Sequence, residues 1–208
     1  PIKNDLLNTQ GEDLEVVLPS VDCILGDKLT AFAPHTTGIP LGIGKELEII
    51  KQMYDVAALI DVFDDFEDVY NSYMAIVETE INYRGLDISA NEVLMDTIDT
   101  AACIAGRGQI GNEYPMYLAG IKSISTHIYD ERYSAEKAVQ SACKTMYLAA
   151  CILQKSNFEK VIDCNLYLDC NIGKSNYSKL SKLRKFNAEA FAYVVKTVEL
   201  LELSLIHI

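Results

Sequence analysis

The chain has 208 residues, of which 50% are hydrophobic and 23% are charged, and its formal net charge is −12. This composition excludes a disordered chain and supplies enough apolar side chains for one good core or two small ones. No run of about 18 uninterrupted apolar residues occurs, so the sequence predicts no membrane span.

In chain order the sequence predicts a mainly α-helical protein. Leu14–Leu18 is the one persuasive strand-like run, and Ser20 can cap the helix that follows it. Hydrophobic periodicity and end signals predict helices over residues 21–33, 46–63, 65–83, 90–104, 114–128, 134–154 and 179–203. Residues 155–177 are polar, and no long helix is predicted there.

The six cysteines include no CxxC pair, and the three histidines do not complete a zinc pattern. The sequence also shows no secretory leader. We therefore expect reduced, mostly buried thiols in a cytoplasmic protein, and no metal site built on cysteine.

Charge is distributed unevenly along the chain. Residues 1–100 carry 20 acidic and 5 basic side chains, a net charge of −15, whereas residues 101–208 carry 10 acidic and 13 basic ones, a net charge of +3. The densest basic run consists of Lys174, Lys179, Lys182, Arg184 and Lys185, with no acid between them. It is either a solvated helix start or a contact for nucleic-acid phosphates, and the overall acidity favours the first.

Lys28 interrupts the apolar face of the first predicted helix. At about 100° per residue, Val21, Ile24, Leu25 and Phe32 form one stripe, and Lys28 falls in its middle. The lysine must extend to solvent, pair with a buried carboxylate, or face a cleft that holds an anion.

The helix predicted over residues 46–63 is apolar on most of its faces and has one short polar stripe. The members of that stripe are Glu48, Lys51, Gln52 and Asp55. Lys51 and Asp55 could pair internally at a spacing of four residues.

The loop between these helices is rich in glycine and hydroxyl side chains. Its polar and glycine positions are Thr36, Thr37, Gly38, Gly42, Gly44 and Lys45. Such a loop can cradle phosphate through backbone N–H groups or serve as a rigid connector, and it lacks the spacing of a P-loop. The GRGQIG sequence at 106–111 follows a helix rather than a strand, so we reject it as a dinucleotide fingerprint.

Three motifs occur in a fixed order: DKLTA at 27–31, TTG at 36–38 and KQMYD at 51–55. Together they closely resemble the C-terminal half of nucleotidyltransferase toxins of the abortive-infection (AbiEii/AbiGii) type, from type IV toxin–antitoxin systems. The close resemblance covers about a fifth of the chain.

The resemblance implies a fold, a reaction and a site. Residues 1–63 would be the remnant of a mixed α/β nucleotidyltransferase domain, with a residual strand, and residues 64–208 an α-helical domain. The reaction would transfer a nucleotide from an NTP to RNA, with tRNA as the expected acceptor and Mg²⁺ as cofactor. Lys28 and Asp55 would be catalytic, with Lys28 on the triphosphate and Asp55 supporting the acceptor or orienting a cation.

Further roles follow from the same resemblance. We assign nucleotide binding to Thr36, Thr37, Lys45 and Lys51. The basic run at 174–185 would contact the tRNA backbone, and a winged-helix antitoxin would be the genetic partner.

The sequence departs from the family at its metal site. The family's Gly-Ser turn and Asp-x-Asp strand, which hold the magnesium, do not occur in these 208 residues. We therefore expect a fragment that lacks its N-terminal catalytic motif and is inactive alone. The alternative is a non-catalytic helical interaction or regulatory module, in which Lys28, Lys51 and Asp55 face no anion site.

Overall fold

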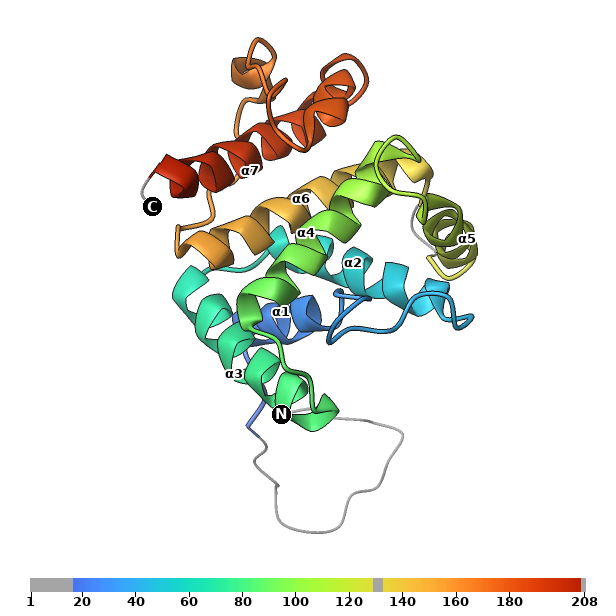
Figure 1. The fold of residues 1–208 in the computed structure, drawn as a ribbon, viewed down its shortest axis with the longest axis vertical. Coiled ribbons are helices and arrows are strands. Elements are labelled where there is room, and N and C mark those ends of the chain that lie inside the picture. Colours follow the sequence, from blue (N-terminus) through green and yellow to red (C-terminus); the bar gives the residue numbers. More distant parts are fainter. Residues whose placement is uncertain (1–16, 129–132, 207–208) are drawn as a thin grey trace, which may run out of the picture.

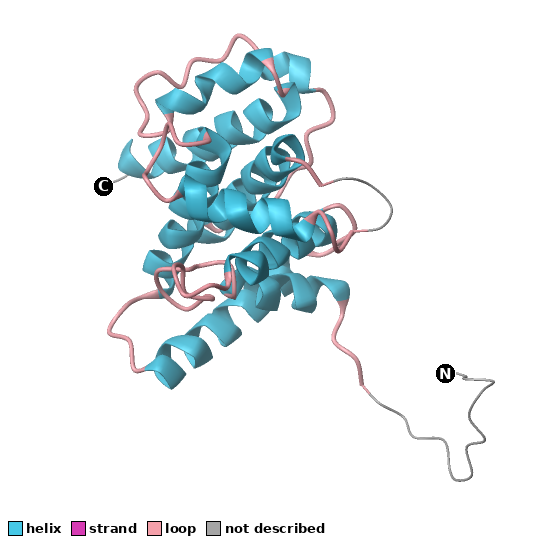
Figure 2. Cartoon of the chain, turned by 90° about the vertical axis from the view of Figure 1, so that its right-hand side faces the viewer, coloured by secondary structure: helices cyan, strands magenta, loops and turns pink. Residues whose placement is uncertain are grey.

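The computed structural model describes residues 17–128 and 133–206, which form a mainly α-helical fold (Figures 1 and 2). The α-helices are α1 (Val21–Thr30), α2 (Glu46–Ile60), α3 (Phe66–Arg84), α4 (Ala90–Gly106), α5 (Tyr114–Ile124), α6 (Ala135–Gln154) and α7 (Ala188–Ile206). The 3₁₀ helices are η1 (Cys164–Tyr167) and η2 (Ser178–Lys185).

The mainly α fold class is confirmed, and the described residues contain no strand. Residues 14–16 of the strand-like run lie outside those residues. The rest of the run, Val17 and Leu18, is exposed and irregular.

The helices pack in layers around one core. In Figure 1, α4 and α6 lie between the α1–α3 pair on one side and α7 on the other, while α5 closes one end against α2. The buried core includes side chains from both sides of residue 63, the domain boundary expected from the resemblance. No helix in the described part of the chain is long and apolar enough to cross a bilayer.

The start of α1 follows its sequence signals, but its end does not. Ser20 Oγ accepts a hydrogen bond from the Cys23 backbone at 3.2 Å, as predicted for an N-cap. Gly26 lets the backbone of α3 approach closely, because a Cβ there would lie 2.7 Å from Tyr73 N. The helix stops at Thr30 instead of Ala33, since the Thr30 carbonyl accepts from Thr37 Oγ1 in the next loop.

The long helix predicted over 179–203 is wrong as a single element. The structure has η2 over the basic run, a break at Phe186 and Asn187, and then α7. Asn187 Oδ1 accepts from Ala190 N at 3.0 Å, so Asn187 begins a new helix. Cations are disfavoured at a helix start, which is a further reason for α7 to begin after the basic run.

The other predicted helix ends differ by a few residues. α2 ends at Ile60 rather than 63, and α5 ends at Ile124 rather than 128. All six cysteines are free; half of them, Cys103, Cys143 and Cys151, are buried, and the others are partly exposed. Burial raises the pKa of the Cys151 thiol to about 12, so this thiol stays protonated at neutral pH.

Candidate functional site

The structure brings Lys28 and Asp55, the two residues expected to be catalytic, into direct contact. Lys28 projects from α1 and Asp55 from α2, and Lys28 Nζ donates to Asp55 Oδ2 at 2.8 Å. The two side chains are 33% and 40% exposed. Of the three alternatives for Lys28, pairing with a carboxylate is the one observed, and the carboxylate is half-buried rather than fully enclosed.

This pair leaves hydrogen-bonding capacity for a ligand. An ammonium group has three N–H donors, and within the described residues Asp55 is the only partner of Lys28. Lys51 lies one turn before Asp55 on α2, is half-buried, and makes no ion pair with any described carboxylate. The internal Lys51–Asp55 pair that the spacing allowed is therefore replaced by a bond between two helices.

The threonines of the TTG loop donate to protein oxygens. Thr37 is buried, and its Oγ1 donates to the Thr30 carbonyl at 3.0 Å. Gly38 N donates to the Ala33 carbonyl at 2.7 Å, and a Cβ on Gly38 would lie 2.6 Å from the Ala31 carbonyl oxygen. The loop thus folds back tightly on the end of α1. The threonine hydroxyls therefore hold the loop in place, whereas the resemblance assigned them to nucleotide binding.

The remaining nucleotide-binding candidate, Lys45, is exposed. It occupies the N-cap position of α2 without a side-chain capping bond. Acidic side chains follow it in the first turn of that helix, at Glu46 and Glu48.

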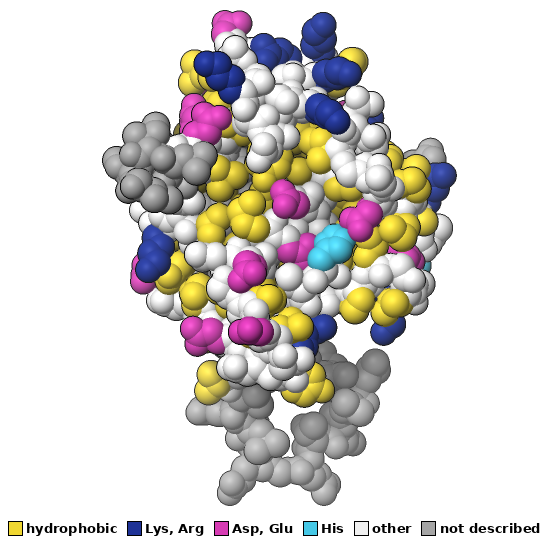
Figure 3. All heavy atoms as spheres, viewed as in Figure 1, with side chains coloured by type: hydrophobic (Ala, Val, Ile, Leu, Met, Phe, Trp, Pro, Cys, Tyr) yellow, Lys and Arg dark blue, Asp and Glu magenta, His cyan; other side chains and the backbone are white. Residues whose placement is uncertain are grey.

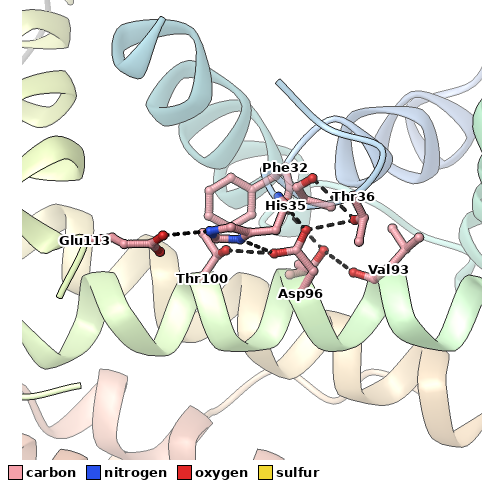
Figure 4. Close-up of polar contacts among 9 residues, drawn as sticks. Phe32, His35, Thr36, Val93, Asp96, Thr100 and Glu113 are labelled. Atoms are coloured by element: carbon pink, nitrogen blue, oxygen red, sulfur yellow. Dashed lines mark hydrogen bonds and ion pairs between the residues drawn. The ribbon is translucent and has the colours of Figure 1, made fainter. Parts of the chain in front are cut away.

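A second polar cluster, which sequence reasoning missed, holds the same loop to α4 and α5 (Figure 4). His35 Nδ1 lies 2.7 Å from Asp96 Oδ1, and His35 Nε2 lies 2.9 Å from Glu113 Oε1. Asp96 is on α4, and its side chain is only 6% exposed. Its oxygens also accept from His35 N at 2.9 Å, Thr36 Oγ1 at 2.8 Å and Thr100 Oγ1 at 3.2 Å.

The charge state of His35 follows from these contacts. Burial lowers the pKa of the imidazole, but hydrogen bonds to Glu113 and Asp96 and their charges outweigh burial, so the net pKa is raised above 6.5. The two carboxylates favour the protonated ring, in which each nitrogen can donate. Because each ring nitrogen lies within hydrogen-bonding distance of a carboxylate oxygen, neither is free to act as a base or to bind a metal.

The basic run divides into separate environments. Arg184 turns inward: its guanidinium donates to the Ser181 and Cys170 carbonyls and lies 4.9 Å from the Phe191 ring centroid. Lys179 Nζ donates to the Gln109 carbonyl at 2.6 Å, while Lys182 and Lys185 are exposed. The run is therefore not one uniform strip of solvated cations.

The described residues do not fit the magnesium that the resemblance implies. No group of three or more His, Cys, Asp or Glu side chains in that part of the chain could hold a metal ion. Asp55 is engaged by Lys28, and Asp96 is engaged by His35, Thr36 and Thr100.

Comparison with known proteins adds no family. No family model matches the chain, and neither the curated proteins nor the solved structures contain a match.

Proposed function

We propose that this chain is the nucleotide-facing part of a nucleotidyltransferase of the AbiEii type. The proposal rests on one observation: Lys28 and Asp55, expected from separate motifs, meet at 2.8 Å across α1 and α2 with part of each side chain exposed. A partly exposed ion pair contributes little to the stability of the fold, and a pair that binds a ligand must remain accessible.

In nucleotidyl transfer an RNA hydroxyl loses its proton to solvent and its oxygen bonds to the α-phosphorus of the NTP, while the bond from that phosphorus to pyrophosphate breaks. Negative charge grows on the leaving pyrophosphate, so a fixed ammonium near it stabilises the transition state. Lys28 would supply that charge while Asp55 holds its ammonium in place. Lys51, one turn away on α2, would contact a further phosphate oxygen.

We assign no step to a metal, because the described residues offer no ligand set for one. This chain by itself is therefore expected to bind NTP without transferring it. The proposal includes an RNA acceptor, expected to be tRNA, that is contacted through the basic run at 174–185. It also includes a winged-helix antitoxin partner and a role in phage defence.

The test is NTP binding by the purified chain, measured by titration calorimetry with each of the four NTPs in the presence of EDTA. Loss of a charge-assisted hydrogen bond of about 1.5–3 kcal/mol predicts that Lys28→Met weakens binding by about tenfold or more. Lys122→Met is the matched control, because Lys122 is an exposed lysine on α5.

Two results would contradict the proposal. One is that no NTP binds to the wild-type chain. The other is that Lys28→Met binds as tightly as Lys122→Met. Either result would support the alternative, a helical interaction module in which the Lys28–Asp55 bond serves only the fold.

A further inference from the structure

A pocket of about 290 Å³ lies where the end of α4, the first turn of α6 and η2 meet. Its lining includes Arg107, Gln109, Glu136, Lys179, Lys182 and Phe186. Lys and Arg side chains gather at this end of the molecule, on the side of α7 (Figures 1 and 3). The pocket is therefore a locally basic site on a chain whose net charge is −12.

The cations of the pocket keep donors for a ligand. Arg107 pairs with Glu136 through one terminal nitrogen, and a guanidinium has five N–H donors. Lys179 uses one bond to the Gln109 carbonyl. Lys182 is exposed and has no partner among the described residues. With Glu136 as its one acid, the lining carries an excess of two positive charges.

The backbone at Arg107 is unusual for an arginine. Arg107 caps α4 in the left-handed region, with φ of 47°, where glycine is the residue normally preferred. The glycine-rich 106–111 segment begins in this turn at the C-terminal end of a helix. That placement agrees with rejecting it as a dinucleotide fingerprint.

One wall of the pocket is apolar and ends in an aromatic ring open to solvent. Leu180 is buried and Leu183 is partly buried, whereas Phe186 is 76% exposed. Phe186 lies in the break between η2 and α7. An exposed ring beside several cations matches the two parts of a nucleotide, because a base stacks on an aromatic face while its phosphate accepts from lysine and arginine.

We propose that this pocket binds one nucleotide unit, with its phosphate at Arg107 and Lys182 and its base against Phe186. The unit comes either from a free mononucleotide or from an RNA strand. The site is distinct from the Lys28–Asp55 pair. Because Lys179 and Lys182 belong to the basic run proposed to contact RNA, the RNA-strand alternative rests on the proposed function, whereas binding of a free mononucleotide does not.

The experiment titrates the full purified chain with AMP, CMP, GMP and UMP, and separately with a short oligoribonucleotide. Lys182→Ala and Phe186→Ala should each weaken binding of the preferred probe by about tenfold, the loss expected for one phosphate contact or one stacked base. Lys122→Ala is the matched control, because it removes an exposed lysine on α5 that belongs neither to the pocket lining nor to the basic run. Its effect should stay within about twofold, against the tenfold loss at the pocket lysine.

A charge change in the opposite direction sharpens the test. Glu136→Gln removes the one acid of the pocket and frees Arg107 from its ion pair, so binding should tighten by several-fold. Tight binding of a mononucleotide identifies the free nucleotide as the source, and binding of the oligoribonucleotide alone identifies a strand.

The inference is overturned if neither probe binds the wild-type chain, or if Lys122→Ala weakens binding as much as Lys182→Ala does. The second outcome would indicate general attraction of a polyanion. Lys28→Met separates the two proposals: it should leave binding at this pocket unchanged, and a loss there would place the mononucleotide at the Lys28–Asp55 pair.

Discussion

Two polar clusters lie beside the loop between α1 and α2. Both join a cation to a carboxylate at similar distances, but they differ in exposure and in how many hydrogen bonds the carboxylate accepts. Lys28 and Asp55 share one bond of 2.8 Å, and both side chains are about one-third exposed or more. Asp96 is nearly buried and accepts from His35, Thr36 and Thr100. The first cluster has spare donors, whereas the second is saturated.

This difference separates the proposed binding site from a cluster that stabilises the fold. A buried carboxylate whose oxygens are all occupied stabilises the fold, because removing it leaves several donors without partners. A half-exposed ion pair contributes little to stability, since water competes for both charges. Stability and binding measurements on the two clusters should therefore diverge.

The largest expected effect on stability is that of Asp96→Ala. The change removes the buried carboxylate that accepts from His35, Thr36 and Thr100, and we expect a loss of about 2–4 kcal/mol in the free energy of unfolding. Urea unfolding followed by circular dichroism measures it, with Asp55→Ala as the matched control. Equal losses for the two variants would remove the distinction between the clusters.

A smaller loss is expected for Thr37→Val, which keeps the shape of the side chain and removes its hydroxyl. Because that buried hydroxyl donates to the Thr30 carbonyl, the variant should lose about 1–2 kcal/mol of unfolding free energy. NTP affinity should stay unchanged. If the variant were as stable as the wild type but bound NTP more weakly, Thr37 would contact the nucleotide, as the resemblance implies.

The His35 cluster should also make stability depend on pH. The pKa of His35 is raised in the folded protein, so its stabilising contribution is fully present below the unfolded value of about 6.5 and is lost as pH rises through the folded pKa. The stability difference between the wild type and His35→Gln should therefore shrink above pH 6.5. Thermal unfolding between pH 5.5 and 8.5 tests this, and a difference that grows with pH would contradict it.

The smallest effect belongs to the Lys28–Asp55 pair. A double-mutant cycle of Lys28→Met and Asp55→Asn should give a coupling energy of about 1 kcal/mol or less, because both side chains are partly solvated. Chemical denaturation of the four proteins provides the cycle. A coupling energy of several kcal/mol would instead indicate that the pair stabilises the fold, as the Asp96 cluster does.

Local signals predicted most of the helices. Ser20 caps α1 as expected, and Ser134 caps α6 in the same way, since each side chain accepts from the backbone three residues on. The break at Asn187 was missed because the hydrophobic period continues across it. That period does not show where a polar side chain, here Asn187, accepts a hydrogen bond from the backbone and begins a new helix.

Part of the candidate site could also be predicted from local sequence patterns. Lys28 stood out because it interrupts an apolar stripe, and Asp55 because it lies on the short polar stripe of an enclosed helix. Asp96 gave no such signal, since a single acid in a long amphipathic helix is ordinary. His35 and Asp96 are 61 residues apart, and Glu113 is a further 17 residues along the chain.

The sequence by itself determined the mainly helical fold, the first caps and the two residues that break their helical patterns, because each depends on neighbours within a few residues. Only the tertiary structure decided what those residues contact. Packing of α1 against α2 made Lys28, rather than Lys51, the partner of Asp55. Docking of the loop on α4 gave Thr36 its acceptor, and folding of the loop back on α1 gave Thr37 its acceptor. Hydrogen bonds between distant segments require a folded core to bring the groups within reach, and that core is a property of the whole chain.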